Sequence, residues 1–278
     1  MIYQDIYPQL RNPQRDTSTW SFSIGGSVRH PFIIAYSDLL LMPMVEVTCA
    51  ILCAGNPHDD SAIEQATWRG VALSSLLENV ITQPAARYAI IHNASGYSTS
   101  LSLDGLSRGI LALQQDGKSL SHKQGFPARL VMPGSYGYKS PRWVERIELS
   151  SLPQGFWEAR GWDGDGVAPT IAAITHPFNH AHVRGAVELK GFAYSADQRI
   201  TSVEVSVDYA DWMPVDFTTS LSTELIRWQA IWTLPNPGEY SVRVRAVGDG
   251  EYVVTSAPPS HLKSGQVPLH SIVIHVTE

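Results

Sequence analysis

Cys53 is the residue of this chain whose type and setting are best suited to chemistry. It stands in the run Cys53-Ala54-Gly55-Asn56, directly after an apolar stretch that is typical of a buried strand. A cysteine thiolate is a soft ligand, and it suits a high-valent, sulfur-ligated metal centre. A free cysteine is more often a small buried hydrophobic residue, and we keep that interpretation for Cys49, the only other cysteine.

The two cysteines do not predict a disulfide. On one strand, Cys49 and Cys53 point to the same face but lie too far apart along the strand to be bridged without a turn. Two free thiols suit a reducing compartment or a role in metal binding. The cysteine usage is therefore compatible with a metal ligand and argues against a disulfide framework.

A second group of residues that could do chemistry lies in the loop between Pro133 and Trp143. Lys139, Ser140 and Arg142 place two cations and a hydroxyl beside glycines in this loop. Together with exposed backbone N–H groups, these side chains could form a cradle for a phosphate group. The alternative interpretation is a solvated turn that binds nothing.

The first part of the chain, residues 1–166, must position both groups. It mixes strand and helix signals: residues 20–24 alternate and end at two glycines, which predicts a strand and a turn, whereas residues 71–80 have helical spacing. Short strands are also expected over 88–92 and 143–149. These signals predict a mixed α/β domain.

The second part of the chain, residues 172–278, has a different pattern. Its apolar residues alternate with period two between turn signals, which is typical of an antiparallel β-sandwich of immunoglobulin type. The turn-rich run 161–166 is interpreted as a linker between the two parts. The predicted fold class is therefore α+β, with a mixed α/β domain followed by an all-β immunoglobulin-like sandwich.

The order of several short motifs is similar to that of the sulfite oxidase family. None of these motifs is specific alone, but their shared order carries the resemblance over nearly the whole chain. They are Cys53-Ala54-Gly55-Asn56, Ala66-Thr67-Trp68-Arg69-Gly70-Val71, Gly96-Tyr97-Ser98-Thr99-Ser100-Leu101, Gly125-Phe126-Pro127-Ala128-Arg129-Leu130-Val131-Met132-Pro133-Gly134 and the loop that ends at Trp143. The resemblance implies a molybdopterin-binding oxidoreductase domain over 1–166 and an immunoglobulin-like dimerisation domain over 172–278, in a divergent, bacterial-type member.

The resemblance also implies roles for individual residues. Cys53 would ligate molybdenum through its thiolate. Tyr97 would lie near the metal's oxygen ligand, where its phenol could donate a hydrogen bond, although tyrosines at strand ends also serve packing. The molybdenum–molybdopterin cofactor would be held by further polar residues, namely Asn56, Ser98, Thr99, Lys139, Ser140 and Arg142.

The chain departs from the family at positions that are usually cationic in members that oxidise sulfite. The run Tyr3–Pro8 lacks the arginine of the usual Arg-Asn-His run, Gln124 stands where a histidine is usual, and the run 57–60 contains His58 and two aspartates in place of basic residues. Recognition of an anion in a desolvated pocket needs compensating positive charge. We therefore expect slow sulfite oxidation, and a neutral S-oxide or N-oxide as the better substrate.

The function predicted from this resemblance is two-electron oxygen-atom transfer on a small molecule. The chain has no Cys-x-x-Cys-His haem motif, so a separate one-electron donor or acceptor is expected, such as a cytochrome or a membrane haem protein. A homodimer is also expected. The alternative is a non-catalytic binding or assembly module that retains the fold, which the missing arginine and the run Asp59-Asp60 motivate.

The composition limits the remaining choices. Of 278 residues, 44% are hydrophobic and 17% are charged, which fits a globular protein with sizeable cores. The net charge of −6 and the lack of a long basic tract do not support nucleic-acid binding. No apolar run approaches the ~20 residues of a membrane span, and no signal peptide is recognised. The chain is expected to be cytoplasmic, or periplasmic if a leader or anchor was removed.

Overall fold

The computed structural model describes residues 13–55, 58, 61, 63–162, 164–218, 223–233, 236–249 and 269–277. The chain divides into two compact units. The first unit comprises Met1–Thr48 and Ala66–Gly166, and the second comprises Cys49–Gln65 and Val167–Glu278. The segment that carries Cys53 is thus grouped with the second unit, whereas the sequence patterns place it in the first domain.

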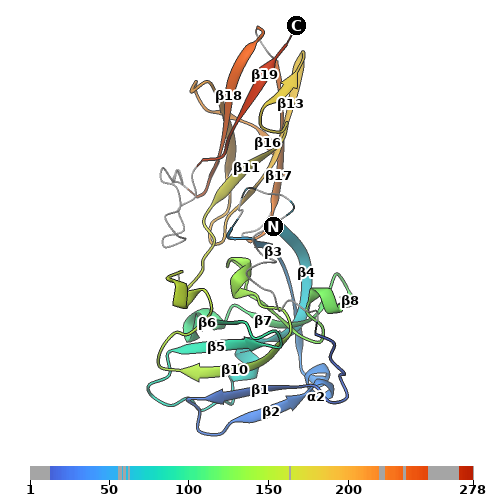
Figure 1. Ribbon diagram of the computed structural model, residues 1–278, viewed down its shortest axis with the longest axis vertical. Helices are drawn as coiled ribbons and strands as arrows, with labels where there is room; N and C mark the ends of the chain where they lie inside the picture. The colour runs from blue at the N-terminus through green and yellow to red at the C-terminus, as the bar shows by residue number, and fades with distance from the viewer. Residues whose placement is uncertain are drawn as a thin grey trace. The chain divides into compact units, whose positions relative to one another are not determined.

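The first unit is built mainly from two sheets (Figure 1). In one sheet, β1 and β10 are parallel and all other neighbours are antiparallel. Its strand order is β2 (Phe32–Ala35), β1 (Ser21–Gly26), β10 (Val144–Ser150), β5 (Tyr88–Asn93) and β6 (Ser98–Ser102). The other sheet has the order β3 (Met44–Leu52), β4 (Ile63–Ala72), β7 (Ile110–Gln115) and β8 (Lys118–Ser119), with β9 (Arg129–Val131) paired to β7.

Helices are short in the described residues, so the prediction of a mixed α/β domain overstated the helical part. They are α2 (Tyr36–Leu41), α3 (Leu73–Leu77) and α4 (Leu103–Leu106), with 3-10 turns η2 (His122–Gln124), η3 (Gly137–Lys139) and η4 (Glu158–Arg160). The run 71–80 shows the reason. Its first two residues, Val71 and Ala72, form the end of β4 and pair with β7. The helix α3 therefore begins only at Leu73 and is short.

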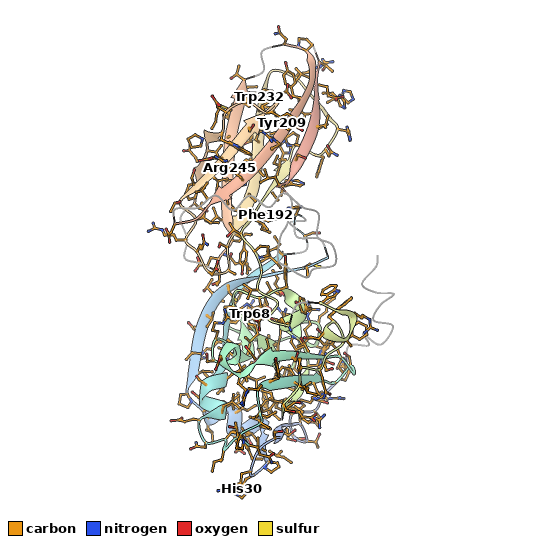
Figure 2. The ribbon with its side chains drawn as sticks, turned by 90° about the vertical axis from the view of Figure 1, so that its left-hand side faces the viewer. His30, Trp68, Phe192, Tyr209, Trp232 and Arg245 are labelled. Carbon is orange, nitrogen blue, oxygen red and sulfur yellow. The ribbon has the colours of Figure 1, made fainter. Side chains whose placement is uncertain are left out.

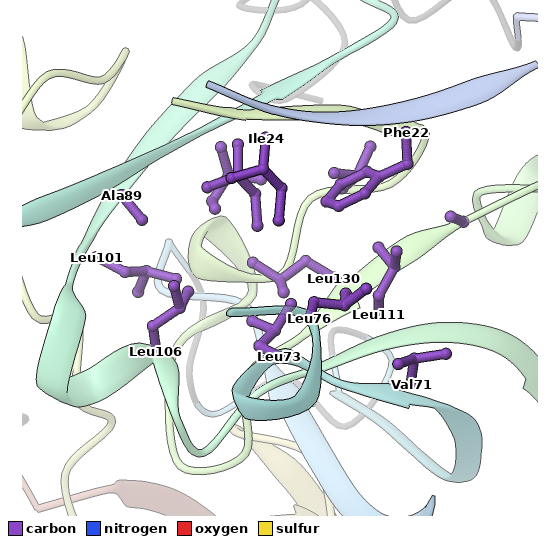
Figure 3. Close-up of a cluster of buried hydrophobic side chains, with 14 of the residues drawn as sticks. Phe22, Ile24, Val71, Leu73, Leu76, Ala89, Leu101, Leu106, Leu111 and Leu130 are labelled. Carbon is purple, nitrogen blue, oxygen red and sulfur yellow. The ribbon is translucent and has the colours of Figure 1, made fainter. Parts of the chain in front are cut away.

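One hydrophobic cluster forms the core of the first unit. Phe22 and Ile24 of β1 contribute the alternate residues of a half-buried strand, and Leu73 and Leu76 come from α3 (Figure 3). Leu111 of β7 belongs to the same cluster, so side chains from both sheets share this core. Full burial of one such side chain stabilises the fold by roughly 1.5–3 kcal/mol.

The second unit contains two further sheets. One has the order β11 (Ile171–His176), β13 (Ala186–Tyr194), β17 (Ile226–Thr233) and β16 (Asp216–Phe217). The other has the order β12 (Ala181–Val183), β19 (Ser271–Val276), β18 (Gly238–Val247), β14 (Ser202–Val207) and β15 (Met213–Pro214). The strands predicted from period-two alternation are therefore present.

The two sheets of the second unit share one apolar core. Val203 and Val205 of β14 pack in it with Trp228 of β17 from the other sheet. The indole N–H of Trp228 donates a hydrogen bond of 3.1 Å to the carbonyl of Phe192. Gly191 lies so close to the Trp228 ring and to the Ala173 carbonyl that a Cβ atom would clash with both. Glycine is required here by this close approach of strands and ring.

Candidate active site

Cys53 lies directly after the last residue of β3, and its side chain is partly exposed. Cys49, within the same strand, is fully buried, and neither cysteine forms a disulfide. The last four residues of β3 are all buried, so the strand end is held firmly by packing. Cys53 is therefore anchored through the backbone of a buried strand, while the residue itself is partly exposed. Asn56, predicted to lie beside it, is outside the described residues.

Lys139 occupies the centre of a buried polar network in the first unit. Its ammonium group donates three hydrogen bonds of 2.6 Å each, to the carbonyls of Ser100 and Gly164 and to Oε1 of Glu158. The side chains of Lys139 and Glu158 are 0% and 7% exposed. An ammonium group has three N–H donors, and protein oxygens account for all three. The cofactor-binding role expected for Lys139 stays a prediction, and the contacts in this structure favour a role in shaping the loop.

Thr99 belongs to the same network. Its hydroxyl donates to Oε1 of Glu158 at 2.7 Å, and the backbone N–H of Ser100 donates to the same oxygen at 2.9 Å. Ser98, at the start of β6, is half-buried and accepts a backbone hydrogen bond from Phe156. The structure thus brings Thr99 and Lys139 together around Glu158, which the sequence patterns did not single out.

Glu158 lies in a segment that we interpreted as leading into a linker. The structure instead packs this segment against the loop between Pro133 and Trp143. Gly166 accepts a hydrogen bond of 2.9 Å from the N–H of Tyr136, and Gly164 accepts one from Lys139. Gly166 therefore serves close approach of the two segments, because a Cβ at this position would clash with the side chain of Lys139.

Tyr97 is buried, and its hydroxyl donates a hydrogen bond of 2.6 Å to the carbonyl of Tyr138. Its backbone N–H donates to the side chain of Asn93 at 3.0 Å, and its ring contacts Phe156. The phenol proton is thus used to hold the loop at Tyr138. This geometry favours a positioning role, since the hydroxyl would have to leave Tyr138 before it could donate to another oxygen.

The other polar residues of this loop, Ser135, Ser140 and Arg142, differ in their surroundings. The hydroxyl oxygen of Ser140 accepts a hydrogen bond of 3.0 Å from the N–H of Met132. The Ser135 hydroxyl is fully buried and has no hydrogen-bond partner among the described residues. Arg142 is exposed, and its carbonyl accepts from Asn93 while its guanidinium is directed to no acceptor in the described part of the chain. Arg142 remains the best cation of this loop for an anionic ligand.

Arg129 is a buried cation that the motifs in the sequence did not single out. It is 3% exposed, and its guanidinium lies over the ring of Trp68, 4.6 Å from the ring centroid (Figure 2 labels Trp68). Cation–π contacts of this kind stabilise a desolvated guanidinium. The available signal was an arginine in the otherwise apolar run from Phe126 to Met132.

Gln124 and His58 stand at positions that the sequence comparison expects to be basic, and the structure shows the local surroundings of both. Gln124 closes the 3-10 turn η2 through a capping box: its side-chain oxygen accepts from the N–H of Ser121 at 2.8 Å. Its side chain is therefore committed to the turn. His58 is neutral near pH 7, because burial and the nearby His270 lower the pKa of His58 to about 4. Asp59, Asp60 and Tyr3–Pro8 lie outside the described residues.

The described residues contain no group of three or more histidine, cysteine, aspartate or glutamate side chains that could hold a metal ion. They also include no helix that is long and apolar enough to cross a membrane.

The residues present fit a molybdenum–molybdopterin cofactor in part. A metal whose other ligands come from a dithiolene and from oxygen needs a single protein thiolate, and Cys53 offers one. The orphaned buried hydroxyl of Ser135 and the exposed guanidinium of Arg142 are suitable donors to a polar, phosphorylated group. Lys139 and Thr99 contribute by shaping the loop rather than by free donors.

Comparisons with known proteins agree with this chemistry. A family model described as "Oxidoreductase molybdopterin binding domain" matches residues 9–157. The chain is 30% identical over 151 residues to the uncharacterized oxidoreductase YuiH of Bacillus subtilis, covering 53% of this chain and 74% of that protein. It is 26% identical over 243 residues to sulfite oxidase of Arabidopsis thaliana, covering 69% and 62%.

Longer relatives are matched over a smaller share of their length. The NADH nitrate reductase 1 of rice is 26% identical over 257 residues, which cover 70% of this chain and 28% of the reductase. Among solved structures, the sulfane dehydrogenase SoxCD of Paracoccus pantotrophus matches with a TM-score of 0.80 and 22% identity, covering 96% of this chain and 80% of that one. This likeness shows that the fold is shared along nearly the whole chain.

Proposed function

Because this chain belongs to the family of molybdopterin-binding oxidoreductases, and is therefore a molybdenum–molybdopterin enzyme, we propose that Cys53 is its thiolate ligand to the metal. The observation that carries this proposal is the contrast within β3. Cys49 is sealed in the core, whereas Cys53 is partly exposed at the strand end. A metal ligand must be deprotonated and accessible, and Cys53 meets the second requirement.

We propose that the reaction is two-electron oxygen-atom transfer on a small molecule, the chemistry that the bound cofactor would supply, with electrons exchanged singly with an external haem protein. The chain's own residues would bind and orient the cofactor. Arg142 would pair with its phosphate, and Ser135 and Ser140 would offer hydroxyl groups nearby in the sequence. Tyr97, Lys139 and Thr99 would hold the loop that presents these donors.

We further propose that the substrate is a neutral S-oxide or N-oxide rather than sulfite. His58 has no positive charge near pH 7, and the side chain of Gln124 is used in a turn. The sequence supplies two aspartates directly after His58. These residues would therefore provide little positive charge to compensate that of an anionic substrate.

The second unit is proposed to be an immunoglobulin-like sandwich that pairs two copies of the chain. Its two sheets with a shared core support the first part. The exposed apolar side chains Ile231 (77%) and Phe178 (79%) are candidates for a contact surface. A convincing interface would bury more than about 1,000 Å² in total, and light scattering of the whole chain would give its mass.

The decisive experiment for the proposed function compares Cys53→Ser with Cys49→Ser, both produced in a host that makes the cofactor. Molybdenum and oxidised pterin are measured in each purified protein, and dimethyl sulfoxide reduction is followed with a reduced viologen dye. We expect Cys53→Ser to lose activity, because a hydroxyl replaces a soft thiolate poorly, and Cys49→Ser to keep it. Normal turnover by Cys53→Ser would refute the ligand assignment.

A further inference from the structure

The two strands that flank the Cys53 connection are tied to the same short segment of the second unit. The N–H of Ala50, in β3, donates a hydrogen bond of 2.7 Å to the carbonyl of Thr223. The N–H of Leu225 donates to the side-chain oxygen of Gln65, in β4. Thr223 is itself held by a hydrogen bond of 2.9 Å from its N–H to the carbonyl of Ser195. The strand ends before and after Cys53 are thus fixed to one place.

A histidine pair provides a third attachment, between these two strands. The rings of His58 and His270 lie 4.7 Å apart between centroids, with an angle of 31° between their planes. His270 is firmly placed: its Nδ1 accepts a hydrogen bond of 2.9 Å from the N–H of Ile174, and its carbonyl accepts one of 3.2 Å from the N–H of Val244. His58 therefore packs against a rigid partner that is anchored to β11 and β18.

The pair holds by ring packing rather than by charge. His270 accepts a hydrogen bond at Nδ1, so its proton lies on Nε2 in the neutral ring. Nε2 of His58 is buried and has no hydrogen-bond partner among the described residues. Burial lowers the pKa of both rings, and the positive charge that His270 could carry lowers that of His58 further. Two neutral imidazoles can stack at this distance, whereas two imidazolium ions would repel each other.

We propose that the His58–His270 pair positions the chain that follows Cys53, and thereby sets the location of the thiolate. This inference rests on the proposed role of Cys53 as metal ligand. His58 is five positions after Cys53, so the two residues are never more than about 17 Å of extended chain apart. Holding His58 in place shortens the length of chain over which Cys53 is tethered, and a shorter tether has less conformational entropy. His58 and His270 are thus positioning residues for Cys53, and all three belong to the second unit.

The test measures the reactivity of the Cys53 thiol in the full chain, purified without cofactor from a host that cannot make it. The rate of modification by Ellman's reagent is compared for wild type, His58→Ala and His58→Phe, with Cys53→Ser identifying the signal of this thiol. We expect His58→Ala to react about three- to tenfold faster, since it loses a ring contact of ordinary strength. His58→Phe keeps a packed ring and should react at the wild-type rate.

A matched control comes from a second histidine pair in the same unit. The rings of His182 and His275 lie 5.0 Å apart and are stacked, on β12 and β19. His182→Ala should leave the thiol rate unchanged, because these strands do not carry the Cys53 connection. In the cofactor-loaded protein, the Mo(V) resonance should shift in His58→Ala and stay unchanged in His182→Ala.

Two results would overturn the inference: a wild-type thiol rate in His58→Ala, or an equal increase in His58→Ala and His58→Phe. Neither result tests the proposed function, which is tested by the molybdenum content and activity of Cys53→Ser. Conversely, a Cys53→Ser protein that keeps its metal and turnover would refute the ligand role. The thiol modification rates of wild type and the His58 variants could still be compared.

Discussion

The loop between Pro133 and Trp143 and the connection after Cys53 differ in the contacts that hold them. The loop is held by a buried ion pair, with Lys139 and Glu158 2.6 Å apart and several hydrogen bonds to backbone carbonyls. The connection is held by two hydrogen bonds at its flanking strands and by one pair of neutral rings. The first segment depends on a buried charge pair, whereas the second depends on neutral contacts.

Because of this difference, we expect substitutions in the two segments to affect different properties, namely folding stability in the first and the position of Cys53 in the second. A buried charge that loses its partner is costly, so Lys139 cannot be replaced without a large loss of folding free energy. A ring contact contributes much less. Changes near Lys139 should therefore act mainly on folding, whereas changes near Cys53 should act mainly on the position of a reactive group. Three substitutions test this contrast.

The largest effect is expected for Lys139→Met. Removing the ammonium leaves the Glu158 carboxylate buried without its cation and should lower the free energy of unfolding by about 3–5 kcal/mol. Urea unfolding followed by fluorescence measures this change. The control is Lys190→Met, whose ion pair with Glu188 is 46% and 50% exposed, and which should lose less than about 1 kcal/mol. Equal losses in the two variants would show that the buried network does not carry the stability of the loop.

A smaller effect, on ligand retention rather than on folding, is expected for Arg142→Ala. The exposed guanidinium should contribute a charge-assisted contact of about 1.5–3 kcal/mol to the cofactor phosphate, while stability changes by no more than about 0.5 kcal/mol. Pterin content after extensive dialysis is the measurement. Arg146→Ala, at an exposed arginine on β10 that pairs with Glu148, should retain the pterin of wild type. Full pterin content in Arg142→Ala would remove this residue from the cofactor site.

The smallest effect concerns acid stability. The pKa of His58 is lowered in the folded protein to about 4 from an ordinary value of 6.5, so the unfolded chain binds a proton at this residue more readily than the folded chain. Its contribution is complete above pH 6.5 and is lost progressively as the pH falls towards 4. We expect His58→Phe to lose less stability than wild type between pH 7.5 and pH 5 in urea titrations. Identical pH dependence in both proteins would contradict a buried, neutral His58.

Much of the fold follows from local patterns. The period-two strands of the second unit are present as predicted, since each buries one face in a shared core. In the first unit, the strands over 20–24, 88–92 and 143–149 also correspond to β1, β5 and β10. The helix expected within 71–80 is shortened because β4 extends to Ala72 and pairs with β7. Pairing with a distant strand cannot be read from local spacing, so the boundary of this helix could not be predicted.

The sequence by itself determined the family, through the order of its motifs, and with it the prediction that Cys53 rather than Cys49 is the metal ligand. Only the tertiary structure decided what the polar residues do. Lys139 and Arg142 are three positions apart and both cationic, yet the first is sealed against Glu158 and the second is exposed. His58 meets His270 only because the chain returns to it at β19. The physical reason is that burial and pairing fix the role of a charged or ionisable side chain, and both depend on segments that are remote in the sequence.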